Sequence, residues 1–108
     1  LQIGPRATLS LSLLLHELAT NAVKYGALSV PEGRVTITWT IENSTEEETL
    51  RMCWAETGGP PVHQPSGKGF GSRLISMGLI GTGGVELGYH QDGLLASMEA
   101  PLSQMQQP

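Results

Sequence analysis

The sequence is poor in cysteine, in basic residues and in long apolar runs. The single cysteine, Cys53, allows no disulfide within the chain and no zinc site built from several cysteines, and it fits a reducing compartment. Six lysines and arginines stand against ten aspartates and glutamates, so the net charge is -4 and the basic face of a general nucleic-acid binder is not expected. These shortages predict a cytoplasmic protein with no nucleic-acid partner.

No apolar stretch reaches the roughly 18 to 20 residues that span a bilayer. Ser10 and Ser12 interrupt the most apolar segment, and no basic leader of a secretory signal precedes it. The chain starts at Leu1 rather than at a methionine, which indicates a piece of a longer protein. At 108 residues it has the usual size of one domain. We expect a monomeric domain that makes no membrane contact.

Apolar residues at three- and four-residue steps predict an amphipathic helix over residues 9–27. The stripe consists of Leu11, Leu14, Leu15, Leu18 and Ala22. Thr8 or Ser10 is expected to cap the start of this helix, and Gly26 is expected to stop it.

Four segments have the alternation typical of strands: residues 35–41, 50–56, 85–90 and 94–99. The first two are expected to pair as a half-buried hairpin, and the last two to pair around a turn at 91–93. The glycine- and proline-rich stretch 57–71 is expected to be irregular, and residues 72–80 predict a second helix.

This order of elements predicts an α+β fold. We expect a two-layer sandwich with the helices on one face of a mixed, mainly antiparallel sheet. The polar tail 103–108 is expected to fray.

The first candidate site is a polar row on the long helix. At 3.6 residues per turn, Glu17, Asn21 and Lys24 share one face. An asparagine oxygen suits Mg²⁺, a lysine one turn further on can neutralise phosphate, and a carboxylate one turn earlier can orient or deprotonate a nucleophile. From spacing alone, an ordinary solvated helix face is the more frequent alternative.

The second candidate site is Trp54-Ala-Glu56-Thr-Gly58. Trp54 and Glu56 lie two residues apart on a predicted strand, so their side chains point to the same side. A carboxylate at a strand end can accept a hydrogen bond from an exocyclic amine such as that of adenine, and glycine lets the backbone approach a ligand. The alternatives are a core aromatic at Trp54 and an exposed strand-end acid at Glu56.

The third candidate site is a glycine loop that runs into the second predicted helix. Glycine-rich backbone at a helix N-terminus offers free N–H groups and a favourable dipole to anions. The spacing matches neither a Walker A loop nor a dinucleotide-binding fingerprint. The candidate nucleotide-binding residues here are Gly69, Phe70, Gly71, Ser72 and Arg73.

The three motifs in this order resemble the ATP-binding superfamily that includes gyrase, the heat-shock chaperones of the same fold, histidine kinases and the mismatch-repair MutL proteins. Within it, the chain resembles the HWE group of bacterial histidine kinases. That group is marked by a histidine in the first motif, here His16, and by Trp-x-Glu in the second, here Trp54-Ala-Glu56.

The resemblance runs from about Gly4 to Leu102 and implies a Bergerat-type sandwich. The catalytic ATP-binding domain would cover residues 1–102, with a lid over about 58–70. ATP and Mg²⁺ are the implied substrate and cofactor. The implied activity is transfer of the ATP γ-phosphoryl group to a histidine on a separate domain of the same kinase, and from there to a response regulator.

Residue by residue, the resemblance makes Asn21 the Mg²⁺ ligand and Glu17 a general base. Lys24 matches a phosphate-contacting residue, and Tyr25 lines the nucleotide pocket. These roles are implied by the resemblance and do not follow from the helical spacing.

The resemblance also places Glu56 where an acid reads the adenine amino group, with Gly58 behind it. Gly69 and Gly71 match the glycine motif that contacts phosphates and hinges the lid. His16 is a family signature with a supporting role, and it is not the phosphate acceptor.

Two departures from the pattern favour an alternative, a degenerate nucleotide-binding module that regulates without phosphotransfer. Pro60 stands where the commoner motif has a second glycine, and Leu94 stands where many relatives have a threonine near adenine. A third reading, a protein-serine kinase that controls sigma factors, is opposed by His16 and by Trp54.

Overall fold

The computed structural model describes residues 2–43, 46–61, 75, 78–79, 84–91 and 93–107. In chain order its elements are helix α1 (Pro5–Lys24), the 3₁₀ turn η1 (Ala27–Ser29), strands β1 (Arg34–Asn43), β2 (Glu48–Thr57), β3 (Val85–His90) and β4 (Gly93–Pro101), and the short helix α3 (Leu102–Met105). The described part is therefore α+β, as the sequence predicts.

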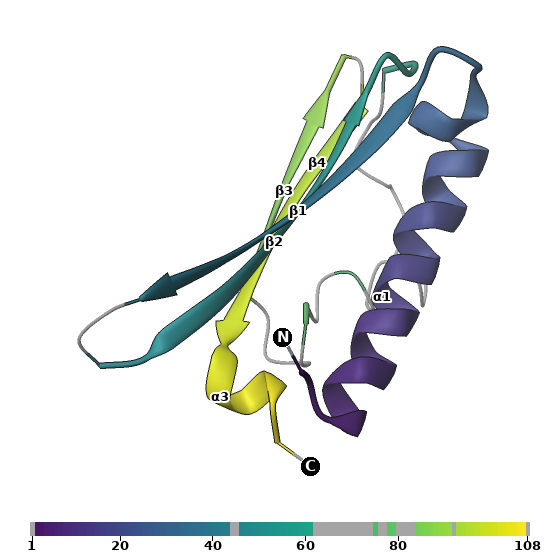
Figure 1. Cartoon of the computed structure of the whole chain (residues 1–108). Coiled ribbons are helices and arrows are strands. Elements are labelled where there is room, and N and C mark those ends of the chain that lie inside the picture. Colours follow the sequence, from purple (N-terminus) through teal and green to yellow (C-terminus); the bar gives the residue numbers. More distant parts are fainter. Residues whose placement is uncertain are drawn as a thin grey trace.

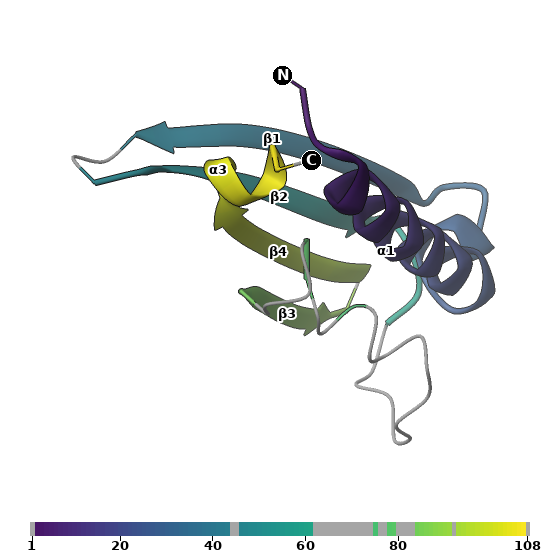
Figure 2. The ribbon, with the colours of Figure 1, turned by 90° about the horizontal axis from the view of Figure 1, so that it is seen from below.

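The four strands form one open antiparallel sheet in the order β1-β2-β4-β3, which is seen across Figure 2. Both predicted hairpins are present, β1 with β2 and β3 with β4. The pairing of β2 with β4 joins them. Every pairing among the described strands is antiparallel, so the parallel part of the expected mixed sheet is not seen there.

Helix α1 begins four residues earlier than the sequence predicts. Pro5 occupies the first helical position, where a missing N–H costs nothing, and Gly4 is the N-cap without a side-chain bond. Thr8 lies inside the helix, where its hydroxyl donates to the Gly4 carbonyl oxygen (2.9 Å), so the expected cap at Thr8 or Ser10 is wrong. Among the described residues, no helix has the length and apolar character to cross a membrane.

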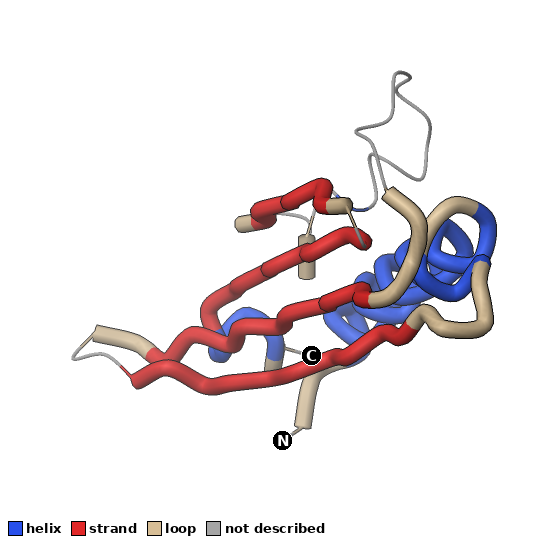
Figure 3. Tube along the Cα trace, turned by 90° about the horizontal axis from the view of Figure 1, so that it is seen from above, coloured by secondary structure: helices blue, strands red, loops and turns tan. Residues whose placement is uncertain are grey.

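The apolar stripe of α1 packs against one face of the sheet, which gives the two layers seen in Figures 1 and 3. Leu14, Leu18 and Ala22 are at most 1% exposed. They meet a row of buried side chains on the two central strands, Leu50, Met52, Trp54, Ala96, Met98 and Ala100. The core is therefore built on β2 and β4, which lie in the middle of the sheet.

Strand β1 is more exposed than the predicted half-buried strand. Ile37, Trp39 and Ile41 remain 40–42% exposed. They face the same side as their buried cross-strand neighbours, Trp54, Met52 and Leu50. β1 is an edge strand, and its arrowhead end lies far from α1 in Figure 1. Partial cover from the helix layer is the physical reason for the difference.

Only part of the second predicted helix, residues 72–80, lies within the described part of the chain. Ile75 is helical, and it joins the core together with Leu79. Gly78 has a φ of 77°, the left-handed conformation that ends helices. The helix therefore stops before residue 80, earlier than predicted.

Part of the tail that was expected to fray is packed. Helix α3 buries Leu102 and Met105, and the Gly4 N–H donates to the Met105 carbonyl oxygen (2.8 Å). This contact sets α3 beside the start of α1 (Figure 1). Two apolar residues one helical turn apart are enough to anchor an otherwise polar segment.

Leu18→Ala tests the core. Leu18 is 0% exposed at the centre of the α1–sheet contact, so its truncation is expected to lower the free energy of unfolding by about 2–5 kcal/mol. Leu13→Ala is the matched control on the same helix, because Leu13 is 43% exposed, and it should cost about 1 kcal/mol or less. Urea unfolding measures both. Equal losses would contradict the described burial of α1.

Candidate functional site

The buried carboxylate of Glu56 is the central feature of the site. Glu56 is near the end of β2 and is only 6% exposed, so it is not the exposed strand-end acid that the sequence left open. Its Oε1 accepts the backbone N–H of Ala27 (3.0 Å), and its Oε2 accepts the indole N–H of Trp54 (2.9 Å). Both oxygens of a buried charge are thus satisfied, as burial requires.

Glycines crowd this carboxylate from two sides. A Cβ at Gly26 would lie 2.2 Å from Glu56 Oε1, and a Cβ at Gly93 would lie 2.6 Å from Glu56 Cβ. Gly93 also has a φ of 152°, which side-chain-bearing residues rarely adopt. Only glycine therefore lets the end of α1 and the start of β4 approach Glu56 this closely.

Ala27 is held from its other sides by glycines from two further segments. A Cβ at Gly33 would lie 1.6 Å from the Ala27 carbonyl oxygen, and a Cβ at Gly59 would lie 2.5 Å from Ala27 Cα. Gly58 has a φ of 71° beside the Glu32 carbonyl oxygen. The sequence motif predicts a close backbone approach at Gly58, and the described contact there is with the protein's own backbone.

The polar row predicted on α1 lies on the flank of its buried stripe. Glu17 and Asn21 are partly exposed, and Lys24 is exposed at the last helical position. Within the described part of the chain, none of these three side chains makes a hydrogen bond or ion pair. Their polar ends are thus available to a ligand.

The helix end connects this row to Glu56. The Asn21 carbonyl oxygen accepts the N–H groups of Tyr25 (2.8 Å) and Gly26 (3.2 Å), and Ala27 follows directly. The backbone leading from Asn21 therefore reaches the Glu56 carboxylate within six residues. Two of the three predicted motifs are in this way brought to the same end of the molecule.

The remaining predicted residues are placed differently. Tyr25 is 70% exposed, so no described residue encloses it in a pocket. His16 is exposed on α1, and its described contact is the backbone bond from Thr20 Oγ1 to its carbonyl oxygen (2.8 Å). The glycine loop and most of the expected lid lie outside the described residues. The predictions for the loop therefore stay predictions: Gly69, Phe70, Gly71, Ser72 and Arg73.

The two departures from the family pattern border this region. Pro60 is partly exposed beyond Gly59, and Leu94 is 9% exposed on the inner face of β4. Leu94 pairs with Tyr89, whose pKa is raised because partial burial disfavours the charged phenolate. Leu94 and Tyr89 therefore present an apolar side chain and a neutral phenol next to Gly93.

The donor set fits a magnesium ion bound jointly with phosphate. The described residues contain no group of three or more histidine, cysteine, aspartate or glutamate side chains that could hold a metal alone. Asn21 offers one hard amide oxygen, which suits an ion that keeps several waters and bridges to phosphate. A bare metal site is thus not expected at Asn21, whereas a metal–nucleotide site is compatible with it.

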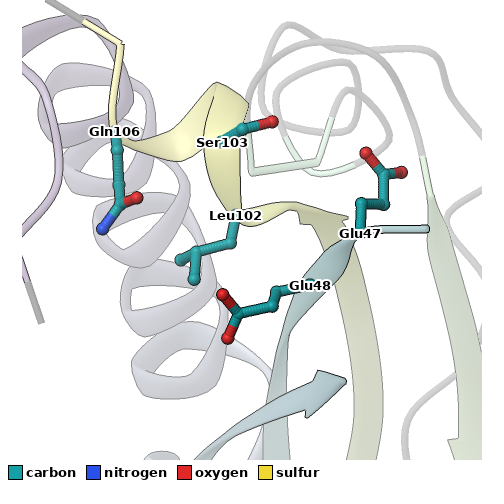
Figure 4. A pocket seen from close by; sticks show the side chains of 5 residues that line it. All are labelled: Glu47, Glu48, Leu102, Ser103 and Gln106. Atoms are coloured by element: carbon teal, nitrogen blue, oxygen red, sulfur yellow. The ribbon is translucent and has the colours of Figure 1, made fainter. Parts of the chain in front are cut away.

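A separate shallow pocket lies at the start of β2. It is lined by Glu47, Glu48, Leu102, Ser103 and Gln106, as Figure 4 shows. This pocket contains none of the predicted site residues. The predicted site residues that the structure describes lie instead around Glu56 and along the last turns of α1.

Sequence reasoning missed three participants of this site: Gly26, Ala27 and Gly93. Ala27 contributes only its backbone N–H, which no side-chain pattern can reveal. The sequence predicts a helix stop at Gly26 and a turn residue at Gly93. Their second role, giving room to Glu56, follows from the packing alone.

Comparison with known proteins gives relatives over nearly the whole chain. It is 43% identical over 105 residues to a blue-light-activated histidine kinase of Brucella anthropi, covering 95% of this chain and 21% of that protein. It is 46% identical over 109 residues to blue-light-activated histidine kinase 1 of Erythrobacter litoralis, covering 96% and 29%. The Brucella ovis protein of the first name is 43% identical, covering 95% and 22%.

Histidine kinases are relatives of this chain. The chain spans less than a third of the length of these curated relatives, between 21% and 29%. No protein-family model matches it.

The Glu56→Gln substitution tests whether both carboxylate oxygens of Glu56 accept a hydrogen bond. A glutamine has one oxygen, so its amide nitrogen must face either the Trp54 or the Ala27 N–H, and we expect a loss of about 1–3 kcal/mol of stability. Glu86→Gln on exposed β3 is the matched control and should change stability by about 0.5 kcal/mol or less. Chemical denaturation of both variants measures the difference. A Glu56→Gln variant as stable as the parent would rule out the two bonds.

Proposed function

We propose that this chain is the ATP-binding catalytic domain of a two-component sensor histidine kinase of the HWE type, with a Bergerat-type fold. It would transfer the γ-phosphoryl group of ATP to a histidine on a separate domain. The observation that carries the proposal is the buried Glu56 carboxylate, which is bonded to the backbone just beyond the helix that bears Asn21. The histidine kinase names of the relatives support it.

Glu56 supplies the adenine end of the proposed site. A carboxylate accepts about four hydrogen bonds, and two of these positions are taken by Trp54 and Ala27. The positions that remain can accept from the exocyclic amine of adenine. Gly58 follows two residues later with a φ of 71°, which lets the chain turn past the Glu32 backbone directly beyond Glu56.

Asn21 and Lys24 supply the phosphate end. When Mg²⁺ is bound with ATP, it would neutralise phosphate charge, and the Asn21 amide oxygen would hold it. The exposed Lys24 ammonium can reach phosphate oxygens from the last position of α1. Tyr25 would cover the nucleotide from the same helix end, and Gly69 to Arg73 would offer backbone N–H groups to phosphate.

Glu17 lies one turn before Asn21 and is partly exposed. Phosphoryl transfer needs mainly positioning and charge neutralisation, so the protein's task is to bring nucleophile and phosphate into line. Glu17 would orient the attacking imidazole or accept its proton. His16 points from the exposed face of the same helix and would support this surface without accepting the phosphoryl group.

The proposal implies two protein partners. The first is the domain that carries the acceptor histidine in the same kinase, and the second is a response regulator that receives the phosphoryl group from it. The names of the relatives state activation by blue light. In such a kinase, this chain would act at the step that follows activation.

Asn21→Ala tests the nucleotide site. Titration calorimetry with a non-hydrolysable ATP analogue should show binding that depends on Mg²⁺ and weakens at least about tenfold in the variant, because the metal's protein ligand is lost. Asn43→Ala is the matched control, because Asn43 lies at the end of β1 that is far from Glu56. This variant should bind the analogue as the parent does. If the parent failed to bind the analogue at millimolar concentration, the proposed function would be wrong.

Glu17→Gln tests the transfer step. The change keeps the shape of the side chain and removes its charge, so we expect phosphotransfer to the acceptor histidine to fall by roughly 10²–10⁴-fold while nucleotide affinity changes little. Radiolabelled γ-phosphoryl transfer in the full-length protein measures this rate. Undiminished transfer in Glu17→Gln would show that Glu17 has no part in the transfer step. The proposed role of Asn21 as the Mg²⁺ ligand would still stand.

A second candidate function is a nucleotide-binding regulatory module that transfers no phosphoryl group. Buried Leu94 favours it, because an apolar side chain there offers no hydrogen bond to adenine or to a bound water. Pro60 adds a stiffer entry to the following loop. Such a module would bind the ATP analogue in calorimetry and never label a histidine, so the two measurements together separate the candidates.

A further inference from the structure

Trp54 has a role beyond filling the core. It is 3% exposed between the apolar residues of β2 and β4, and its indole N–H is directed at Glu56 Oε2 at 2.9 Å. Buried tryptophans usually find a partner for this N–H, but here the partner is the one charged side chain buried among the described residues. The polar edge of the buried Trp54 ring is therefore hydrogen-bonded to the central residue of the candidate site.

We propose that Trp54 is a positioning residue that holds the Glu56 carboxylate in the orientation that accepts a 6-amino group. The chain would thereby select 6-aminopurine nucleotides over 6-oxopurine nucleotides. This inference rests on the proposed function and adds the origin of its base selectivity.

Two donors fix the carboxylate from different parts of the fold. Trp54 lies two residues before Glu56 on the same face of β2, so its N–H reaches Oε2 along the strand. Ala27 approaches Oε1 from η1, the turn that follows α1. A glutamate held at one oxygen can still turn about its terminal torsion, whereas a glutamate held at both oxygens cannot. Pre-ordering a flexible side chain in this way removes an entropic cost from binding.

The fixed carboxylate presents only acceptors to a ligand. An adenine amino group donates to it, whereas the 6-oxo group of hypoxanthine would face the carboxylate lone pairs with lone pairs of its own. A site built around one hydrogen bond rejects a ligand that leaves it unpaired far more strongly than an apolar pocket does. Selectivity therefore depends on the carboxylate keeping its direction.

The chain offers a matched pair of tryptophans for a test. Trp54→Phe keeps an aromatic ring in the core and deletes the N–H, so Glu56 Oε2 loses its donor. Trp39→Phe makes the same change on β1, where Trp39 is 42% exposed and no described residue bonds to its indole. Replacing Trp54 by benzothienylalanine is a second variant, since sulfur takes the place of the N–H in a bicyclic ring of nearly the same shape.

The measurement is the affinity of the full chain for ATP and for inosine triphosphate, each with Mg²⁺, reported as a ratio. We expect the parent to favour ATP and the ratio to fall about tenfold in Trp54→Phe and in the benzothienyl variant, the effect of one hydrogen bond to a charged group. Trp39→Phe should leave the ratio unchanged. Thermal melting of each variant identifies any that is unfolded, in which case the benzothienyl variant decides.

A purely structural role for Trp54 predicts a different result. Looser packing would weaken both nucleotides alike and leave their ratio at the parent value, and that result in a folded variant would overturn the inference while the proposed function stood. A parent chain that bound ATP and inosine triphosphate equally would show that Glu56 does not read the amino group. A parent that bound neither nucleotide would overturn the proposed function and the inference with it.

Discussion

The carboxylate of Glu56 joins the two layers of this molecule at one end. It is a buried charge, and its only described partners are the Trp54 indole from its own strand and the Ala27 N–H from the segment after α1. Hydrogen bonds to a charged group contribute roughly 1.5–3 kcal/mol each, whereas an unpaired buried charge costs several kcal/mol. The path of the chain from α1 into η1 therefore depends on this carboxylate.

The glycines around it follow from that constraint. Gly26 and Gly93 border Glu56 itself, and Gly33 and Gly59 border Ala27, all at distances that no Cβ tolerates. Four backbone segments thus converge on one hydrogen-bonded group. Away from this point the layers are held by apolar packing of α1 on β2 and β4, which needs no such precision of backbone approach.

On α1, the residues that stabilise the fold and the residues proposed to bind the nucleotide lie on different faces of the helix. Leu14 and Leu18 of the apolar stripe are fully buried, while Glu17 and Asn21 on the adjacent flank remain partly exposed and make no described side-chain bond. One helix can therefore anchor the sheet and present polar groups next to Glu56. On the outer face of the sheet, Arg51 pairs with Glu99 (2.6 Å) and Glu42 (3.3 Å), exposed contacts that contribute little to stability.

The sequence alone determined the elements whose cause is local. Strict alternation over 35–41 and 50–56 predicted the β1–β2 hairpin, and the apolar steps from Leu11 to Ala22 predicted the buried stripe of α1, because side-chain periodicity follows directly from backbone geometry. It also proposed Asn21 and Glu56 as site residues, by spacing and by resemblance.

Tertiary structure decided what depends on contacts between distant segments. The packing of Met105 beside Gly4, the exposure of β1 at the sheet edge and the burial of Glu56 all require knowing which segment lies against which. The partner of Glu56 at Ala27 is a backbone N–H, which every residue except proline carries, so no residue pattern could indicate it. The periodicity of a helix or strand can be read from the order of apolar and polar residues along the chain. The direction of the buried Glu56 carboxylate is set by hydrogen-bond donors 2 and 29 residues away, which only the folded chain brings together.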